Sequence, residues 1–227
     1  GTGTIAYDLS GYGNNGKLVN GPTWTTGKFD GALSFDGVDD YVYRSRFTGT
    51  PGSYMTICAW IKTTITDAVI LQLNRSSSNY YNEMVFKIKG GKLQFWDYGT
   101  GVYGFPGTQT SVGYVNTNNW KFVCFVKNST LGKYYIDGTF DSQVTASRDV
   151  QYGSNDFVIG KDYRDNNLFL NGIIDEIRIY NTALSDAEIN NLYANYDLVT
   201  LNYPGKSLVR KYTFPEPTTS IGAEERL

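Results

Sequence analysis

Histidine is absent from the 227-residue chain, and the only cysteines are Cys58 and Cys124. The absence of histidine excludes catalytic triads that need an imidazole, zinc sites with histidine ligands and the ordinary pH switch near neutrality. Each cysteine lies in an apolar, strand-like run. Such residues are typical of inert core thiols, or of a disulfide if the two strands are neighbours. The two cysteines do not indicate whether the protein resides in an oxidising or a reducing compartment.

A strong excess of charge is also missing. Lys and Arg number 20 against 22 Asp and Glu, and no basic run occurs. A surface of this kind argues against a nucleic-acid partner and against binding to an anionic membrane. No apolar stretch is long enough to cross a bilayer. We therefore expect no nucleic-acid partner and no membrane insertion.

Helix-forming residues are sparse, whereas aromatic residues make up 15% of the chain and glycine occurs 25 times. This balance favours many short strands joined by tight turns. The alternation of residues between strand faces supports this prediction, because Leu93 and Phe95 share one face of a predicted strand and Trp96 lies on the other. The pair Gly90-Gly91 before that strand is typical of a hairpin turn. The predicted fold class is all-β, with two antiparallel sheets packed as a sandwich.

One short helix is predicted near the C-terminal end. Ser185 and Glu188 form a capping box ahead of Ile189 and Leu192, which follow at helical spacing. Beyond the helix the sequence becomes polar and contains prolines that favour an extended chain. We predict one domain over residues 1–197, followed by an extra strand and a linker-like tail over residues 198–227.

A long strand is predicted at residues 172–181. Alternation places Asp175 on the face that also carries three isoleucines, at positions 173, 177 and 179. That face should be buried. An ionised carboxylate is costly there unless it is paired, hydrogen-bonded or bound to a metal. We therefore expect Asp175 to have a specific partner.

Several short signatures follow one another along the chain. In order they are DLSGYGNNG at 8–16, GALSFDGVDDYV at 31–42, AWI at 59–61, NWKFV at 119–123, YIDG at 135–138 and GIIDEIRIYN at 172–181. Together they resemble a LamG-like domain of the concanavalin A-like lectin/glucanase superfamily, over roughly residues 3–196. The resemblance implies a jelly-roll sandwich of roughly a dozen strands.

The loop at 8–16 offers carboxylate and amide oxygens on a glycine-rich backbone, which is the kind of ligand set that Ca²⁺ needs. We expect a structural calcium held by Asp8, Asn14 and Asp175, with Asp36 as a further ligand. The resemblance supports this, since related sandwiches often carry calcium near the chain termini. The alternative is that Asp8 and Asn14 cap backbone amides in an Asx-turn while Asp175 accepts amide hydrogen bonds.

Glucanase activity occurs in the superfamily that the chain resembles. A retaining glycosidase needs two carboxyl groups about 5 to 5.5 Å apart. Asp175 and Glu176 are adjacent and point to opposite faces of a strand, as do Asp39 and Asp40, and the catalytic Glu-x-Asp-x-x-Glu pattern of the superfamily is missing. We predict that this segment is not an enzyme, whereas the protein to which it belongs can still be a glycoside hydrolase.

Carbohydrate binding needs a groove, planar aromatic rings and a few amides or carboxylates. The candidate rings are Tyr81, Trp96, Tyr98, Tyr103 and Tyr114. We predict a carbohydrate-binding module that recognises a polysaccharide or glycan, extracellular or on the cell surface, and joined to other domains of a larger enzyme or surface protein. The alternative is an adhesion or structural module without glycan binding, because tyrosine is common on exposed strand faces of any β protein.

Overall fold

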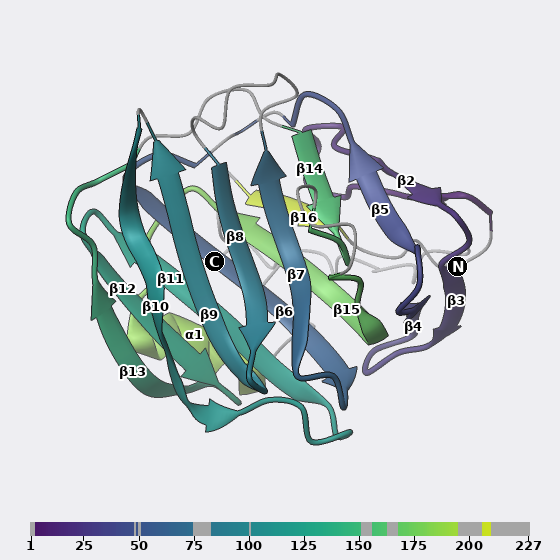
Figure 1. The fold of residues 1–227 in the computed structure, drawn as a ribbon. Helices are drawn as coiled ribbons and strands as arrows, with labels where there is room; N and C mark the ends of the chain where they lie inside the picture. The colour runs from purple at the N-terminus through teal and green to yellow at the C-terminus, as the bar shows by residue number, and fades with distance from the viewer. Residues whose placement is uncertain are drawn as a thin grey trace, which may run out of the picture.

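The computed structural model describes residues 3–47, 49, 51–74, 83–99, 101–150, 156–162, 168–194 and 206–209. Two antiparallel sheets pack face to face, with the strands of the second sheet behind those of the first (Figure 1). The main hydrophobic core lies between them and takes side chains from both. The predicted all-β sandwich is confirmed.

The front sheet in Figure 1, here called sheet A, has the strand order β1-β2-β5-β14-β7-β8-β9-β10. Its strands are β1 Ile5–Ala6, β2 Gly16–Val19, β5 Tyr41–Arg44, β7 Asp67–Asn74, β8 Glu83–Lys89, β9 Lys92–Gly99, β10 Val102–Tyr114 and β14 Asp156–Ile159. Because β14 lies between β5 and β7, the sheet joins segments that are far apart in the sequence.

The rear sheet, sheet B, has the order β13-β12-β11-β6-β15-β4-β3, and β16 pairs with β15. Its strands are β3 Thr23–Thr26, β4 Gly31–Asp36, β6 Tyr54–Thr63, β11 Lys121–Asn128, β12 Leu131–Ile136, β13 Thr139–Thr145, β15 Asn171–Tyr180 and β16 Lys206–Val209. Strand β4 pairs with the first part of β15 and β16 with the last part. The division of the chain at residue 197 stays a prediction.

Local sequence signals explain several of these elements. Gly90 and Gly91 join β8 to β9 with φ angles of 58° and 78°, the left-handed values that a two-residue hairpin turn requires. The helix α1, Asp186–Ala194, begins after the predicted capping box. The amide of Ser185 donates to Glu188 Oε2 at 2.7 Å, and the amide of Glu188 donates to Ser185 Oγ at 3.3 Å. Both predictions are confirmed.

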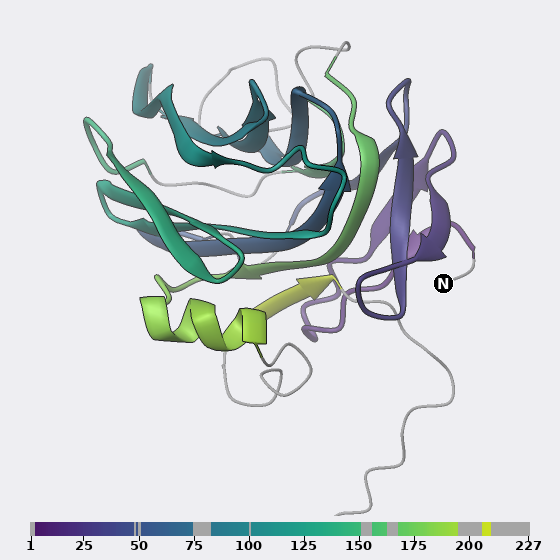
Figure 2. The same ribbon diagram turned by 90° about the horizontal axis from the view of Figure 1, so that it is seen from below.

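Helix α1 covers the outer face of sheet B, on the side away from sheet A (Figure 2). Its buried residues, Ile189 and Leu192, join a second apolar cluster that includes Cys58 and Cys124. These two cysteines lie directly opposite each other on β6 and β11 with their Cα atoms 4.2 Å apart, and they form a disulfide. The sequence left open whether the two cysteines are free core thiols or a disulfide between neighbouring strands, and the structure contains the disulfide.

Strand β15 departs from the predicted alternation. A bulge follows Asp175, and Glu176 has a φ of 51°. Beyond the bulge Ile177 faces the main core, whereas Asp175 lies opposite Trp60 on the outer face of sheet B. The predicted face shared by Asp175 and three isoleucines is therefore wrong. The extra residue of a bulge shifts the alternation by one position, and no local sequence pattern marks it here.

Candidate functional site

Three of the predicted aromatic residues meet on the outer face of sheet A. Tyr98 and Tyr103 are partners across β9 and β10, with ring centroids 4.8 Å apart and the rings at 64°. Trp96 contacts Tyr103 edge to face, at a centroid distance of 6.0 Å. We call Trp96, Tyr98 and Tyr103 the β9–β10 aromatic patch. Nearly half of the surface of Tyr103 is exposed, at 48%, so this ring offers an open face for stacking.

Trp96 is a buried member of the patch. Only 7% of its surface is exposed, and it packs in a cluster with Val69 and Val85 on the same face of the sheet. The backbone of Gly107 also lies against it, since a Cβ at that position would come within 3.0 Å of Trp96 Cβ. The sequence predicted an exposed stacking ring here. In this structure Trp96 instead packs beside Tyr98 and edge to face with Tyr103, because tertiary packing covers its own surface.

The remaining predicted rings do not join the patch. Tyr114 pairs with Lys92 at the far end of β9, six residues from Tyr98, which corresponds to about 20 Å along a strand. It is 60% exposed, and the ammonium group of Lys92 lies 4.9 Å from its ring centroid. Tyr81 lies outside the described residues.

Polar side chains accompany the patch on the same face. Glu83 is the cross-strand partner of Tyr98, and Gln72 pairs with Val85 in the neighbouring row; both are buried. Gln94 Nε2 donates to the carbonyl of Gly107 at 2.6 Å. None of these residues was among the predicted ligand-binding residues. Period-two alternation through β8 and β9 could have placed Glu83 and Gln94 beside the aromatic rings.

The predicted calcium ligands have hydrogen-bond partners in three different segments of the chain. In the first, the carboxylate of Asp8 accepts hydrogen bonds from the amide of Ser10 at 2.9 Å and the amide of Asn14 at 2.8 Å. The hydroxyl of Ser10 donates to the same carboxylate at 2.7 Å. Both carboxylate oxygens thus bind groups of their own loop, which is the Asx-turn arrangement left open by the sequence.

Asp36 lies in a second segment, the turn between β4 and β5. Its carboxylate lies with those of Asp39 and Asp40, and a ligand oxygen from each falls within 4.8 Å of the others. Asp36 Oδ1 accepts the amide of Val38 at 2.8 Å, and Asp40 Oδ2 accepts the amide of Asp36 at 3.0 Å. Burial, followed by the charges of Asp36 and Asp39, holds the pKa of Asp40 above its usual value. Three converging carboxylates are a donor set that suits Ca²⁺.

The partner of Asp175 belongs to a third segment, the loop before β4. Asp175 Oδ2 accepts the amide of Phe29 at 2.9 Å. Gly27 also lies close, since a Cβ there would sit 2.4 Å from the same oxygen. Burial raises the pKa of Asp175 to about 6, the charge of Glu176 adds to the shift, and the bond from Phe29 opposes it. The expected specific partner is thus a backbone amide.

The comparisons with known proteins agree with this architecture. A family model described as the concanavalin A-like lectin/glucanases superfamily matches residues 36–190. No curated protein matches the sequence. Among the described residues, no helix is long and apolar enough to cross a membrane.

Several solved structures share the fold at low sequence identity. Domain 4 of AbnA, a GH43 extracellular arabinanase from Geobacillus stearothermophilus in complex with arabinotriose, is 18% identical, with a TM-score of 0.63 over 84% of this chain and 98% of that one. The binding domain of Paraclostridial Mosquitocidal Protein 1 is 15% identical, with a TM-score of 0.62 over 85% of this chain and 52% of that one. Mouse laminin alpha1 domains LG4-5 are 13% identical, with a TM-score of 0.55 over 74% of this chain and 45% of that one. The chain thus spans about half of the last two structures.

Proposed function

Because the chain belongs to the concanavalin A-like lectin/glucanase superfamily, we propose that it is a non-catalytic carbohydrate-binding module of an extracellular or cell-surface protein. The β9–β10 aromatic patch is the observation that supports this proposal most directly. It combines an exposed ring at Tyr103 with a partly exposed ring at Tyr98, held by a buried Trp96. Exposed aromatic rings held in a rigid position are what stacking on a sugar ring needs.

The similar arabinanase domain gives a first choice of ligand. That domain was solved in complex with arabinotriose, and it matches this chain over nearly its whole length. Arabinan oligosaccharides therefore belong in a panel with other plant, microbial and animal glycans. The fold alone does not choose among them, because one fold hosts many specificities.

The test compares two exposed tyrosines on opposite sheets. Tyr103→Ala should weaken binding of the best ligand by about tenfold, the loss expected for one stacking ring. Tyr54→Ala is the matched control, because Tyr54 is similarly exposed, at 53%, and lies on β6 of sheet B. Titration calorimetry measures both. Equal affinity for the wild type and Tyr103→Ala would contradict this site, and failure to bind any glycan in a broad array would favour the rival adhesion or structural module.

The absence of catalysis is supported by the position of the acids. Asp36, Asp39 and Asp40 gather at the turn that leads into β5, and β5 lies four strands from β9 in sheet A, about 19 Å at the usual strand spacing. These three carboxyl groups are too far away to act as a pair with Glu83, the carboxylate beside Tyr98, on the bond of a sugar stacked on the patch. Assays on arabinan, xylan and β-glucans should release no reducing sugar. Turnover that a single acid substitution abolishes would refute this part of the proposal.

We also propose that Ca²⁺ stabilises the module. The Asp36–Asp39–Asp40 group supports a site in the β4–β5 turn, because its carboxylates already converge and carry like charges that a cation would neutralise. Asp8, Asn14 and Asp175 stay the alternative ligands, although the carboxylates of Asp8 and Asp175 are engaged by backbone amides. Each set predicts a different variant that loses the response to calcium.

A further inference from the structure

A lysine occupies an inward position of sheet B. Lys127 follows Val123 and Phe125 on the face of β11 that points into the core, and its cross-strand partner Met55 belongs to the same core. Its side chain is fully buried, at 0% exposure. A lysine is almost never buried to this extent unless charged or polar partners surround it.

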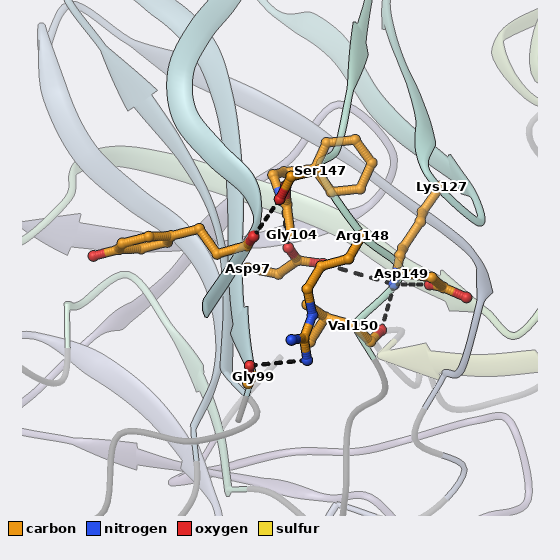
Figure 3. A network of polar contacts seen from close by, with 10 residues as sticks. Asp97, Gly99, Gly104, Lys127, Ser147, Arg148, Asp149 and Val150 are labelled. Carbon is orange, nitrogen blue, oxygen red and sulfur yellow. Dashed lines mark hydrogen bonds and ion pairs between the residues drawn. The ribbon is translucent and has the colours of Figure 1, made fainter. Parts of the chain in front are cut away.

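Those partners come from two other segments (Figure 3). Lys127 Nζ lies 2.9 Å from Asp149 Oδ1 and 3.6 Å from Asp97 Oδ2, and it donates to the carbonyl of Val150 at 2.5 Å. Asp97 lies on β9 of sheet A, with its side chain fully buried, whereas the side chain of Asp149 is 22% exposed. The ion pair of Lys127 with Asp97 therefore connects the two sheets through the interior.

Charged side chains meet in this cluster largely away from solvent. Two carboxylates face one ammonium group, and two of the three side chains have no contact with solvent. Charges removed from water carry a desolvation penalty that a single ion pair repays only in part. A reaction that converts the fully buried ammonium and carboxylate into a neutral amide would remove that penalty and leave the charge on Asp149, which can reach water.

We propose that Lys127 and Asp97 form an intramolecular isopeptide bond, which ties β11 of sheet B covalently to β9 of sheet A. Lys127 is the nucleophile and Asp97 supplies the acyl group. The side chain of Asp149 transfers protons between them. The cross-link would fix the strand that carries the β9–β10 aromatic patch.

The reaction is a condensation that needs no further reagent. The Nζ–Cγ bond forms and the Cγ–Oδ2 bond of Asp97 breaks. Asp149 takes protons from Lys127 and passes them to the departing Oδ2, so that two of the three ammonium protons leave with this oxygen as water. The third proton stays on the amide nitrogen, and no atom is oxidised or reduced.

The backbone around Asp97 suits the charge that develops in this reaction. The amide of Phe105 donates to Asp97 Oδ1 at 2.6 Å, so it can stabilise the oxyanion of the tetrahedral intermediate. The neighbouring Gly104 permits this approach, because a Cβ there would lie 2.3 Å from Oδ1. The carbonyl of Val150 holds Lys127 Nζ in place between the two acids. Proximity of this kind is a major source of rate in an intramolecular reaction.

The other lysine–aspartate pairs found in the described part of the chain lack this environment. Lys121 Nζ lies only 2.6 Å from Asp137 Oδ2, but the two side chains are 24% and 32% exposed. Water solvates such a pair, and hydrolysis competes with condensation there. Lys121 and Asp137 thus provide an internal control, because their charged groups are closer together than those of Lys127 and Asp97 but more exposed to solvent.

Mass spectrometry of the intact, folded wild-type protein tests the proposal. The mass should fall below the sequence mass by one water, in addition to the two hydrogens lost at the Cys58–Cys124 disulfide. After reduction and tryptic digestion, peptide 93–121 should remain joined to peptide 122–133 through Lys127 and Asp97. A folded wild type without the loss of water overturns the proposal, and so does a cross-link that maps to Asp149.

Two variants test the roles of the residues, with circular dichroism as a check on folding. Lys127→Arg should show the mass of the disulfide form alone, and Asp149→Asn should lose or strongly slow the loss of water while Asp97 and Lys127 remain in place. The control Lys121→Arg should keep the loss of water in full. An unchanged loss of water in folded Asp149→Asn would contradict the assigned proton transfer.

Discussion

The carboxylate of Asp175 accepts a hydrogen bond from the backbone amide of Phe29 at 2.9 Å, across 146 positions of sequence. This contact fastens the loop before β4 to the bulge in β15. The carboxylate is also buried, and burial raises its pKa to about 6. One residue thus holds two distant segments together and carries a charge that its surroundings disfavour.

The raised pKa of Asp175 predicts a pH dependence of stability. Between about pH 4 and pH 6 the folded state binds a proton at Asp175 that the unfolded state has already released, so the free energy of unfolding should fall as pH rises. The upper bound is about 3 kcal/mol for a shift of this size. Asp175→Asn keeps an oxygen acceptor for Phe29 and should flatten this part of the curve. Urea unfolding at several pH values measures it, and parallel curves for wild type and variant would contradict the assignment.

Calcium should raise the melting temperature, and chelation should lower it. A ligand that binds only the folded state stabilises it by about 2.7 kcal/mol at a hundred times its dissociation constant. Asp36→Asn and Asp40→Asn should abolish this response if the β4–β5 turn holds the ion. Asp8→Asn should keep it, and thus serves as the matched control. If Asp8→Asn abolishes the response while Asp36→Asn and Asp40→Asn keep it, the result would favour the site at Asp8, Asn14 and Asp175. Identical melting with and without chelator would exclude both calcium sites.

Trp96→Ala should destabilise the fold as well as weaken glycan binding. Its side chain is 7% exposed and packs on Val69 and Val85. Truncation of a buried large aromatic residue costs about 3 kcal/mol or more. Chemical denaturation measures this loss, and Tyr103→Ala should lose much less because its ring is nearly half exposed. Equal stability of the two variants would show that Trp96 does not have the supporting role described here.

The disulfide should contribute strongly to stability. Cys58 and Cys124 close a loop across a sequence separation of 66 residues. A cross-link of this length lowers the entropy of the unfolded chain by an amount worth about 4 kcal/mol. The double variant Cys58→Ala, Cys124→Ala should lose about this much in urea unfolding, since alanine leaves no buried thiol. A loss below about 1 kcal/mol would contradict this contribution of the disulfide.

Local patterns in the sequence were sufficient for the elements that depend on neighbouring residues. The glycines at 90 and 91 define the β8–β9 hairpin, and Ser185 with Glu188 defines the start of α1. Alternation in β9 assigns Phe95 to the core and Trp96 to the opposite face. Each of these features follows from the conformational preferences of a few adjacent residues, so the local sequence is sufficient to predict it.

The positions of the acidic side chains could not be predicted from local sequence patterns alone. The bulge after Asp175 moves this carboxylate to the outer face, and nothing in the isoleucine repeat indicates it. Asp8, Asp36 and Asp175 were predicted as ligands of one site, and in the fold their carboxylates accept hydrogen bonds from three different segments. The spacing of Asp36, Asp39 and Asp40 could have indicated the acidic turn, but only the folded hairpin brings the three carboxylates together.

The sequence by itself determined the sandwich, its hairpins and its helix, because alternation and turn chemistry act over a few residues. Only the tertiary structure decided which rings stay open to a ligand and which charges are buried. Alternation already places Lys127 and Asp97 at inward positions, but the two strands belong to different sheets. Their approach depends on how the sheets pack, and this packing is the sum of many contacts distant in sequence, which no short pattern records.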